Sequence, residues 1–222
     1  MIAPRTLVLF DVDGTLIDSQ VHILEAMKIA FSVQGLSLPS REEVLSIIGL
    51  SLFEAFEQLC PGADDAQRAA LVANFKKSFS ILRHTMGPSP LYPGALACLD
   101  LLKGVEHLVL GIATGKSRRG LDYVLSNPDL AGRFSTKQVA DDHPSKPDPA
   151  MVLQAMVETG AFRGVMIGDT SFDMKMGRAA GLKTIGVSWG YHSANVIGEN
   201  ADMVIDHFED LLPEIQNLWS DA

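Results

Sequence analysis

The fold is decided by the stretch Leu7-Val8-Leu9-Phe10-Asp11-Val12-Asp13-Gly14-Thr15. Its first four residues form a continuous apolar run, which is typical of a strand buried on both faces of a parallel sheet. Asp11 ends this run, and Gly14 permits a turn directly afterwards. Open α/β sheets bind their ligands at the carboxyl ends of the strands, so Asp11 is expected to lie in a ligand site.

The second half of the chain alternates between the two kinds of secondary structure. Strands are expected at 107–113, 137–140, 165–167, 184–187 and 203–205. Helices are expected at 95–102, 118–125, 149–158, 172–180 and 208–219. This alternation predicts an α/β fold built on a doubly wound parallel sheet.

The stretch from Ser19 to about His84 shows apolar residues at helical spacing and no strand pattern. Ser19 is expected to cap its first helix. A proline-rich break follows at 88–94 and is typical of a domain boundary. We therefore predict a catalytic core of residues 1–17 and 89–222 with an inserted α-helical cap of residues 18–88. Inserted after an acidic strand end, the cap is placed to act as a lid that moves on hinges near Asp18 and 83–90.

Composition limits the class of protein. The chain has 222 residues, of which 47% are hydrophobic and 20% charged, as is ordinary for a globular protein. Its net charge of −9 argues against a nucleic-acid partner, and no apolar run approaches the ~20 residues that cross a bilayer. Cys60 and Cys98 show no disulfide or zinc-site spacing. We expect a cytoplasmic monomer or homodimer that acts away from membranes.

Four groups of polar residues follow four of the predicted strands. They are Asp11-Val12-Asp13-Gly14-Thr15, Thr114-Gly115-Lys116, Lys146-Pro147-Asp148-Pro149 and Gly168-Asp169-Thr170-Ser171-Phe172-Asp173. This ordered set resembles the haloacid dehalogenase (HAD) superfamily, and the helical insertion is similar to its C1-type cap. The resemblance spans almost the whole chain. It implies a HAD-like Rossmannoid core that hydrolyses phosphate esters.

The chemistry of the residues agrees with this resemblance. Phosphoryl transfer needs a nucleophile, neutralisation of the phosphate charge and a proton for the leaving oxygen. Asp11 is expected to be a carboxylate nucleophile that forms an aspartyl-phosphate. Asp13 is expected to protonate the departing alcohol and later to deprotonate the attacking water. Lys146 is the expected cation between nucleophile and phosphate, and Asp148 either orients it or caps the next helix.

A Mg²⁺ ion is the expected cofactor, because this ion prefers oxygen ligands. Asp11 and Asp169 are the expected side-chain ligands, and the resemblance implies that the Asp13 carbonyl also binds. Asp173 lies one helical turn beyond Asp169. It either contacts the metal directly or holds a metal-bound water.

Thr114 and the loop after it are expected to bind the phosphate oxygens. The commonest family form has asparagine where this chain has Gly115, so no side-chain role is expected there. Lys116 either binds phosphate, steadies the loop or lies at the surface.

Several cap residues allow two interpretations. Gly49-Leu50-Ser51-Leu52 either approaches the active site and selects the substrate or is an ordinary turn between helices. Arg83 either binds a substrate anion or is solvated. Phe53 and Phe56 belong either to the cap core or to the inner face of the lid.

Within the superfamily, Gly186-Val187-Ser188-Trp189-Gly190-Tyr191 is similar to a motif of phosphoglycolate phosphatases. We therefore predict a Mg²⁺-dependent phosphatase of a small phosphorylated metabolite, with phosphoglycolate as the leading candidate. A β-phosphoglucomutase-like phosphotransferase and an inorganic pyrophosphatase remain as alternatives. A haloacid dehalogenase would not need Asp13 or Asp169, and a catalytically silent protein would be expected to have lost the acids.

Overall fold

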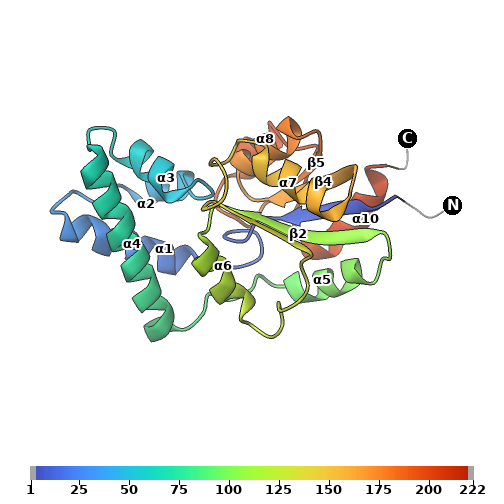
Figure 1. The fold of residues 1–222 in the computed structure, drawn as a ribbon, viewed down its shortest axis with the longest axis horizontal. Helices are drawn as coiled ribbons and strands as arrows, with labels where there is room; N and C mark the ends of the chain where they lie inside the picture. Colours follow the sequence, from blue (N-terminus) through green and yellow to red (C-terminus); the bar gives the residue numbers. More distant parts are fainter. Residues whose placement is uncertain (1–3, 220–222) are drawn as a thin grey trace.

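The computed structural model describes residues 4–219 and is built around one six-stranded sheet (Figure 1). Its strands are β1 (Thr6–Phe10), β2 (Leu108–Thr114), β3 (Thr136–Val139), β4 (Arg163–Gly168), β5 (Lys183–Val187) and β6 (Met203–Ile205). All neighbouring strands are parallel, in the order β3-β2-β1-β4-β5-β6. The predicted α/β fold is confirmed. Residues 1–3 and 220–222 of the predicted core lie outside the described residues.

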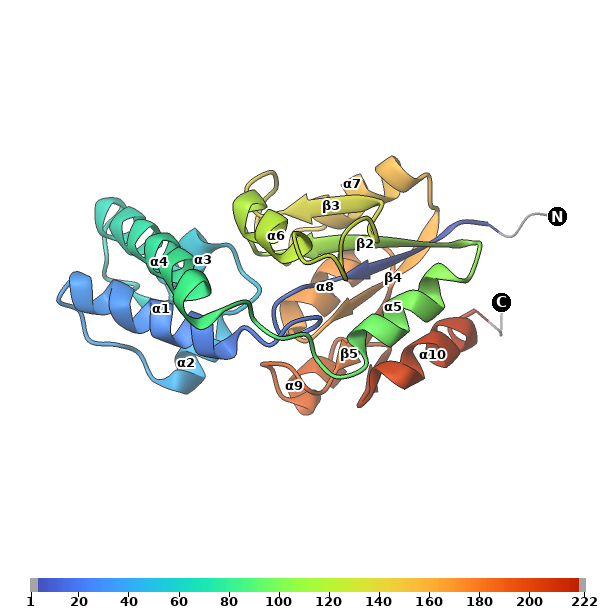
Figure 2. The same cartoon turned by 90° about the horizontal axis from the view of Figure 1, so that it is seen from below.

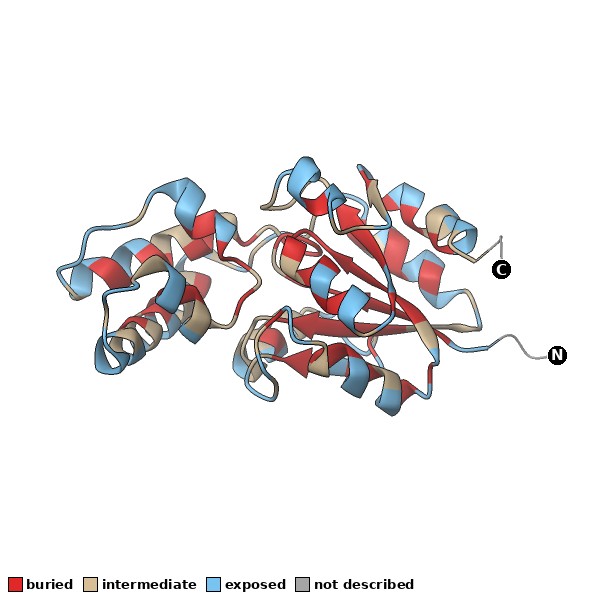
Figure 3. Cartoon of the chain, turned by 90° about the horizontal axis from the view of Figure 1, so that it is seen from above, coloured by how far each residue is buried: buried red, intermediate tan, exposed pale blue. Residues whose placement is uncertain are grey.

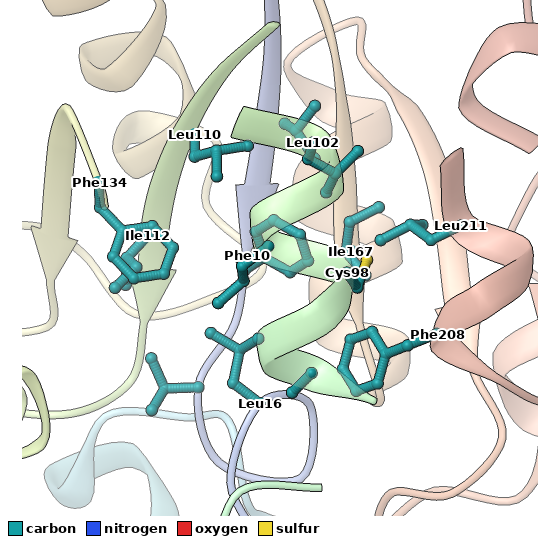
Figure 4. Packing of buried hydrophobic residues seen from close by; sticks show 14 of the residues in the cluster. Phe10, Leu16, Cys98, Leu102, Leu110, Ile112, Phe134, Ile167, Phe208 and Leu211 are labelled. Carbon is teal, nitrogen blue, oxygen red and sulfur yellow. The ribbon is translucent and has the colours of Figure 1, made fainter. Parts of the chain in front are cut away.

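Helices cover both faces of this sheet (Figure 1). One face carries α5 (Ala95–Lys103), α6 (Arg118–Leu125) and α10 (Leu211–Asn217), and the other α7 (Ala150–Thr159) and α8 (Ser171–Ala179). On the first face Phe10 and Ile167 pack against Leu102 and Leu211 (Figure 4). Alternate residues of β1 belong to the cluster on the opposite face. Strand β1 is apolar throughout because both of its faces are buried.

The strand order reverses at β1, and this reversal locates the site. The chain leaves β1 for β2 and β3 on one side, then returns to β4, which pairs with the other side of β1. Connections that diverge in this way leave a crevice beyond the carboxyl ends of the strands. Asp11, Thr114 and Asp169 directly follow or end the three strands around this point.

Four helices between β1 and α5 form a separate layer beyond the carboxyl ends of the strands (Figure 2). They are α1 (Gln20–Val33), α2 (Arg41–Ser46), α3 (Leu52–Leu59) and α4 (Asp65–Met86). They enclose an apolar cluster of their own, and Figure 3 shows it as a second buried interior beside that of the sheet. The Asp18 N–H donates to the Pro90 carbonyl at 2.9 Å, so the two connections to the sheet run side by side. The domain boundaries at 18 and 88 stay a prediction.

The structure differs from the sequence expectations at a few elements. The short helix α9 (Ala194–Gly198) was not predicted, and the last predicted helix is divided into a 3₁₀ turn, η1 (Phe208–Asp210), followed by α10. The expectation that the Ser19 side chain caps α1 is wrong, because its hydroxyl donates to Asp13 instead. Cys60 and Cys98 are free thiols. No helix in residues 4–219 has the length and apolarity to cross a membrane.

A matched pair of substitutions in α3 tests the cap core. Phe56 is fully buried, whereas Phe53 on the same helix is 42% exposed. Phe56→Ala should lower the free energy of unfolding by about 3–5 kcal/mol, because it leaves a cavity. Phe53→Ala should cost only about 0.5–1 kcal/mol. Urea denaturation measures both values, and equal losses would contradict the assignment of Phe56 to the cap core.

Candidate active site

Three carboxylates meet at the crevice around one lysine. Asp11 follows β1, Asp169 follows β4, and Asp173 lies in the first turn of α8. One oxygen from each lies within 4.8 Å of the others, and all three residues are buried. The Lys146 ammonium lies 2.9 Å from Asp11 Oδ1 and 2.6 Å from Asp173 Oδ1. The structure thus brings these four residues together.

The Asp169 carboxylate is held by its neighbours. It accepts hydrogen bonds from the Thr15 hydroxyl and the Tyr191 N–H, each at 2.9 Å. Gly14 has a φ of +79°, and a Cβ at this position would lie 2.1 Å from Asp169 Oδ2. A glycine is therefore required both for the turn and for the close approach of the carboxylate.

Asp173 and Lys146 are held by the loops that carry them. Asp173 forms a capping box with Thr170 at the start of α8, which fixes its side chain. Asp148 accepts from the Ala150 N–H at 2.9 Å. Of its two interpretations, the structure favours helix capping, and it anchors the loop from which Lys146 enters the cluster.

The electrostatics of this cluster favour a cation. The pKa of Asp11 is raised to about 6, mainly by burial. Lys146 lowers it in part, and the nearby charges of Asp173 and Asp13 raise it. Burial, Asp173 and Asp11 raise the pKa of Asp169 well above its usual value. Burial alone would lower the pKa of Lys146, but Asp11 and Asp173 raise it. One ammonium does not neutralise three carboxylates, and an all-oxygen donor set fits a divalent metal such as Mg²⁺.

Asp13 lies beside this cluster but has different partners. Both of its carboxylate oxygens accept from the Lys116 ammonium at 2.7 Å, and the Ser19 hydroxyl donates to one of them. The Lys116 side chain is only 8% exposed, so the interpretation of a surface lysine is wrong. Thr114 is buried at the end of β2, where its hydroxyl accepts from the Lys116 N–H at 3.3 Å.

The cap loop 49–52 contacts the core directly. A Cβ on Gly115 would lie 2.5 Å from the Gly49 carbonyl oxygen and 2.7 Å from that of Leu50. The Ser51 N–H donates to the Ser145 hydroxyl at 2.8 Å. The loop is therefore a docking contact rather than an ordinary turn. This contact also explains why the chain has glycine where the commonest family form has asparagine.

A cavity of about 280 Å³ lies between the cap and the acids. Asp11, Asp13 and Thr114 line one side, and Phe75 and Phe79 of α4 line the cap side. The interpretation of Phe53 and Phe56 as the inner face of the lid is wrong. Phe56 is enclosed in the cap core, and Phe53 is 42% exposed. The aromatic rings that line the cavity come from α4 and not from α3.

Two residues at the site were not assigned a role from the sequence. The Tyr191 hydroxyl accepts from the Ser19 N–H at 3.2 Å, which links the entry to α1 with the loop after β5. A His192 ring nitrogen lies 3.1 Å from the Ser46 carbonyl oxygen in the cap. The only signal for Tyr191 was its place in the 186–191 motif. His192 had none, because its partner is distant in the sequence.

Comparisons with known proteins agree with this architecture. The family model for haloacid dehalogenase-like hydrolases matches residues 8–187. The chain is 32% identical to the "probable phosphatase IndB" of Dickeya dadantii, over 94% of this chain and 92% of that protein. It is 31% identical to a pyrophosphatase, PpaX, of Bacillus velezensis, over 93% and 94% of the two chains. It is also 31% identical to a phosphoglycolate phosphatase of Yersinia pseudotuberculosis, over 94% and 92%.

The solved structures show the same likeness. A hydrolase from Pseudomonas syringae matches with a TM-score of 0.85 and 25% identity, over 97% of this chain and all of that one. The chain belongs to the haloacid dehalogenase-like hydrolases. The predicted family and the prediction of a hydrolytic enzyme are confirmed.

The buried acids predict how metal and pH change stability. The pKa of Asp11 rises from 3.8 to about 6 on folding, so the folded protein binds more protons than the unfolded one between these values. In metal-free protein, the free energy of unfolding should therefore fall as pH rises through this window, by roughly 1–3 kcal/mol. Mg²⁺ should raise Tm more at about pH 7.5 than at about pH 5, because protons compete with the metal for the same oxygens. Differential scanning calorimetry measures both effects. Equal Mg²⁺ shifts at the two pH values would contradict the assignment of the metal to these acids.

The docked cap loop predicts a second effect. Gly115→Ala places a Cβ against two backbone carbonyls and should weaken docking of the cap. A small overpacking penalty of this kind should raise KM ~10-fold. Gly62→Ala is the control, because nothing lies within 4 Å of its added Cβ. Steady-state kinetics on p-nitrophenyl phosphate measure both. An unchanged KM in Gly115→Ala would show that the loop does not dock this closely during turnover.

Proposed function

We propose that this protein is a Mg²⁺-dependent phosphatase that hydrolyses a small phosphomonoester through an aspartyl-phosphate at Asp11. The observation that carries the proposal is the set of three buried carboxylates around Lys146, one of which, Asp11, also lines the cavity between the core and the cap. Similarity to proteins named phosphatases supports the reaction class.

In the first step a carboxylate oxygen of Asp11 attacks phosphorus, and the bond from phosphorus to the ester oxygen breaks. Asp13 gives its proton to the departing oxygen, so an alcohol leaves. Asp13 lines the same cavity as Asp11 but is held apart from the acid cluster by Lys116 and Ser19. This placement suits a proton donor on the leaving-group side. Lys116 must release Asp13 before that carboxylate can carry a proton.

In the second step water attacks the phosphorus of the aspartyl-phosphate. Asp13 takes the proton of this water, and the bond between phosphorus and Asp11 breaks to release inorganic phosphate. Thr114, the N–H groups of the Gly115–Lys116 loop and Lys146 bind the phosphate oxygens. Asp11, Asp169, Asp173 and the Asp13 carbonyl would hold Mg²⁺, which supplies charge neutralisation for the transferring phosphoryl group.

The helical insertion is proposed to be a lid that excludes water from these steps. A cavity of about 280 Å³ suits a short ester. Phosphoglycolate is the proposed substrate, supported by the likeness to the Yersinia phosphatase and by the 186–191 motif. Inorganic pyrophosphate is the second candidate, because the PpaX relative has the same 31% identity and similar coverage. A ranking of kcat/KM over a panel of phosphate esters and pyrophosphate decides between them.

Two isosteric substitutions separate the proposed roles. Asp11→Asn removes the nucleophile and should abolish turnover of every ester, as EDTA should. Asp13→Asn should lose at least ~10²-fold on alkyl phosphates, the usual scale of acid–base catalysis, and less on p-nitrophenyl phosphate, whose leaving group needs less protonation.

Asp129→Asn is the matched control, since this acid is exposed and lies in a loop after α6. Steady-state phosphate release measures all three variants. Near-normal turnover in Asp11→Asn, or activity that survives removal of the metal, would overturn the mechanism.

A further inference from the structure

The cavity above Asp11 contains a cation that has no counter-ion. Arg83 lies in the last turn of α4, is only 9% exposed and lines the cavity wall. Its Nε is buried and has no hydrogen-bond partner. Within residues 4–219 no carboxylate lies within ion-pair distance of its guanidinium. The sequence left open a solvated arginine, and in the structure the side chain is largely buried and faces the cavity.

The contacts of Arg83 are aromatic rather than ionic. Its guanidinium carbon lies 4.1 Å from the centroid of the Tyr123 ring and 6.0 Å from that of Phe79. These rings orient the planar group but leave its N–H donors unused. Burial lowers the pKa of Arg83, Tyr123 partly offsets this, and the charge of Arg119 lowers it further. Arg119 lines the same cavity, so its wall carries two arginines.

The acids of the cavity are already engaged elsewhere. Asp11 pairs with Lys146, and Asp13 pairs with Lys116. Asp141 accepts from the Arg118 N–H at 2.7 Å. A buried guanidinium nitrogen without an acceptor is costly, and the Arg83 Nε has none among the described residues.

Arg83 is placed on the leaving-group side of the proposed reaction. Arg83 and Lys116 both contact the Phe79 ring, and the Lys116 ammonium, 5.3 Å from the ring centroid, is 2.7 Å from Asp13. The transferring phosphate belongs at Asp11, Thr114 and Lys146 instead. Arg83 also lines a second cavity of about 360 Å³, which it shares with Phe79 and Lys116, so the leaving group has room to extend past it.

We propose that Arg83 binds a second anionic group, on the leaving portion of the substrate, and so selects phosphate compounds that carry one. This inference rests on the proposed phosphatase function. The group is an oxyanion, either a carboxylate or a second phosphate, and two of its oxygens accept hydrogen bonds from the guanidinium N–H groups. The rival is a purely structural contact between α4 and α6, since the Tyr123 hydroxyl also donates to the Arg83 carbonyl at 3.4 Å.

The test compares substrates that have and lack this second anion. Phosphoglycolate carries a carboxylate and pyrophosphate a second phosphate, whereas ethyl phosphate is of similar size to phosphoglycolate and has neither. Arg83→Met should lower kcat/KM for at least one of the first two by ~10-fold or more, the scale of a charged hydrogen bond. It should leave kcat/KM for ethyl phosphate within about 2-fold. A loss confined to one of the two anionic substrates identifies the group that Arg83 binds.

Lys77→Met is the matched control, because it removes one charge from an exposed position of the same helix. Arg83→Lys keeps the charge but loses the fork, and provides the same comparison if Arg83→Met does not fold. Equal losses on all three substrates, or no loss on any, would overturn the proposal in favour of the structural contact. A wild-type protein that hydrolyses none of these three substrates and no p-nitrophenyl phosphate either would instead overturn the phosphatase function itself.

Discussion

The interaction on which the site depends is the pairing of one buried ammonium, that of Lys146, with two carboxylates, Asp11 and Asp173. A third carboxylate, Asp169, shares the same space without a cation of its own. Isolated charges in a protein interior are costly, so this arrangement persists only because the surrounding fold positions it. The sheet supplies two of the acids from strand ends, and the loop before α7 supplies the lysine. The three carboxylates carry more negative charge than one ammonium neutralises, which favours a divalent cation beside Asp11.

The cap has a complementary part in this account. Its loop 49–52 contacts the phosphate-binding loop so closely that position 115 has no room for a Cβ. Aromatic rings from α4 cover the acids and lower the local dielectric, which strengthens every charge interaction beneath them. Arg83 differs from these apolar side chains, because it is a largely buried cation that faces the cavity. In the proposed function, the core would provide the phosphoryl-transfer chemistry, and the cap would provide the features that distinguish one ester from another.

Much of this architecture could be predicted from the sequence, because its signals are local. The apolar run 7–10, the alternation after residue 94 and the helical stretch from 19 to 84 correspond to the observed sheet and helices. The acids were predicted to meet because carboxyl ends of parallel strands share one edge. Contacts between distant segments could not be predicted. The pairing of Lys116 with Asp13, the use of the Ser19 hydroxyl at Asp13 and the burial of Arg83 all depend on how the cap docks. Phe75 and Phe79, rather than Phe53 and Phe56, line the cavity because helix rotation is set by packing among four helices.

The central claim is that Asp11 itself accepts the phosphoryl group, and chemical trapping tests it most directly. Wild-type and Asp13→Asn protein would be quenched with acid during turnover of p-nitrophenyl phosphate and reduced with borohydride, which converts an acyl phosphate to an alcohol. Peptide mass spectrometry then identifies the modified residue. The account predicts homoserine at position 11, with more of it in Asp13→Asn because the second step is slowed. Modification at another acid, or none in either protein while phosphate is released, would contradict it.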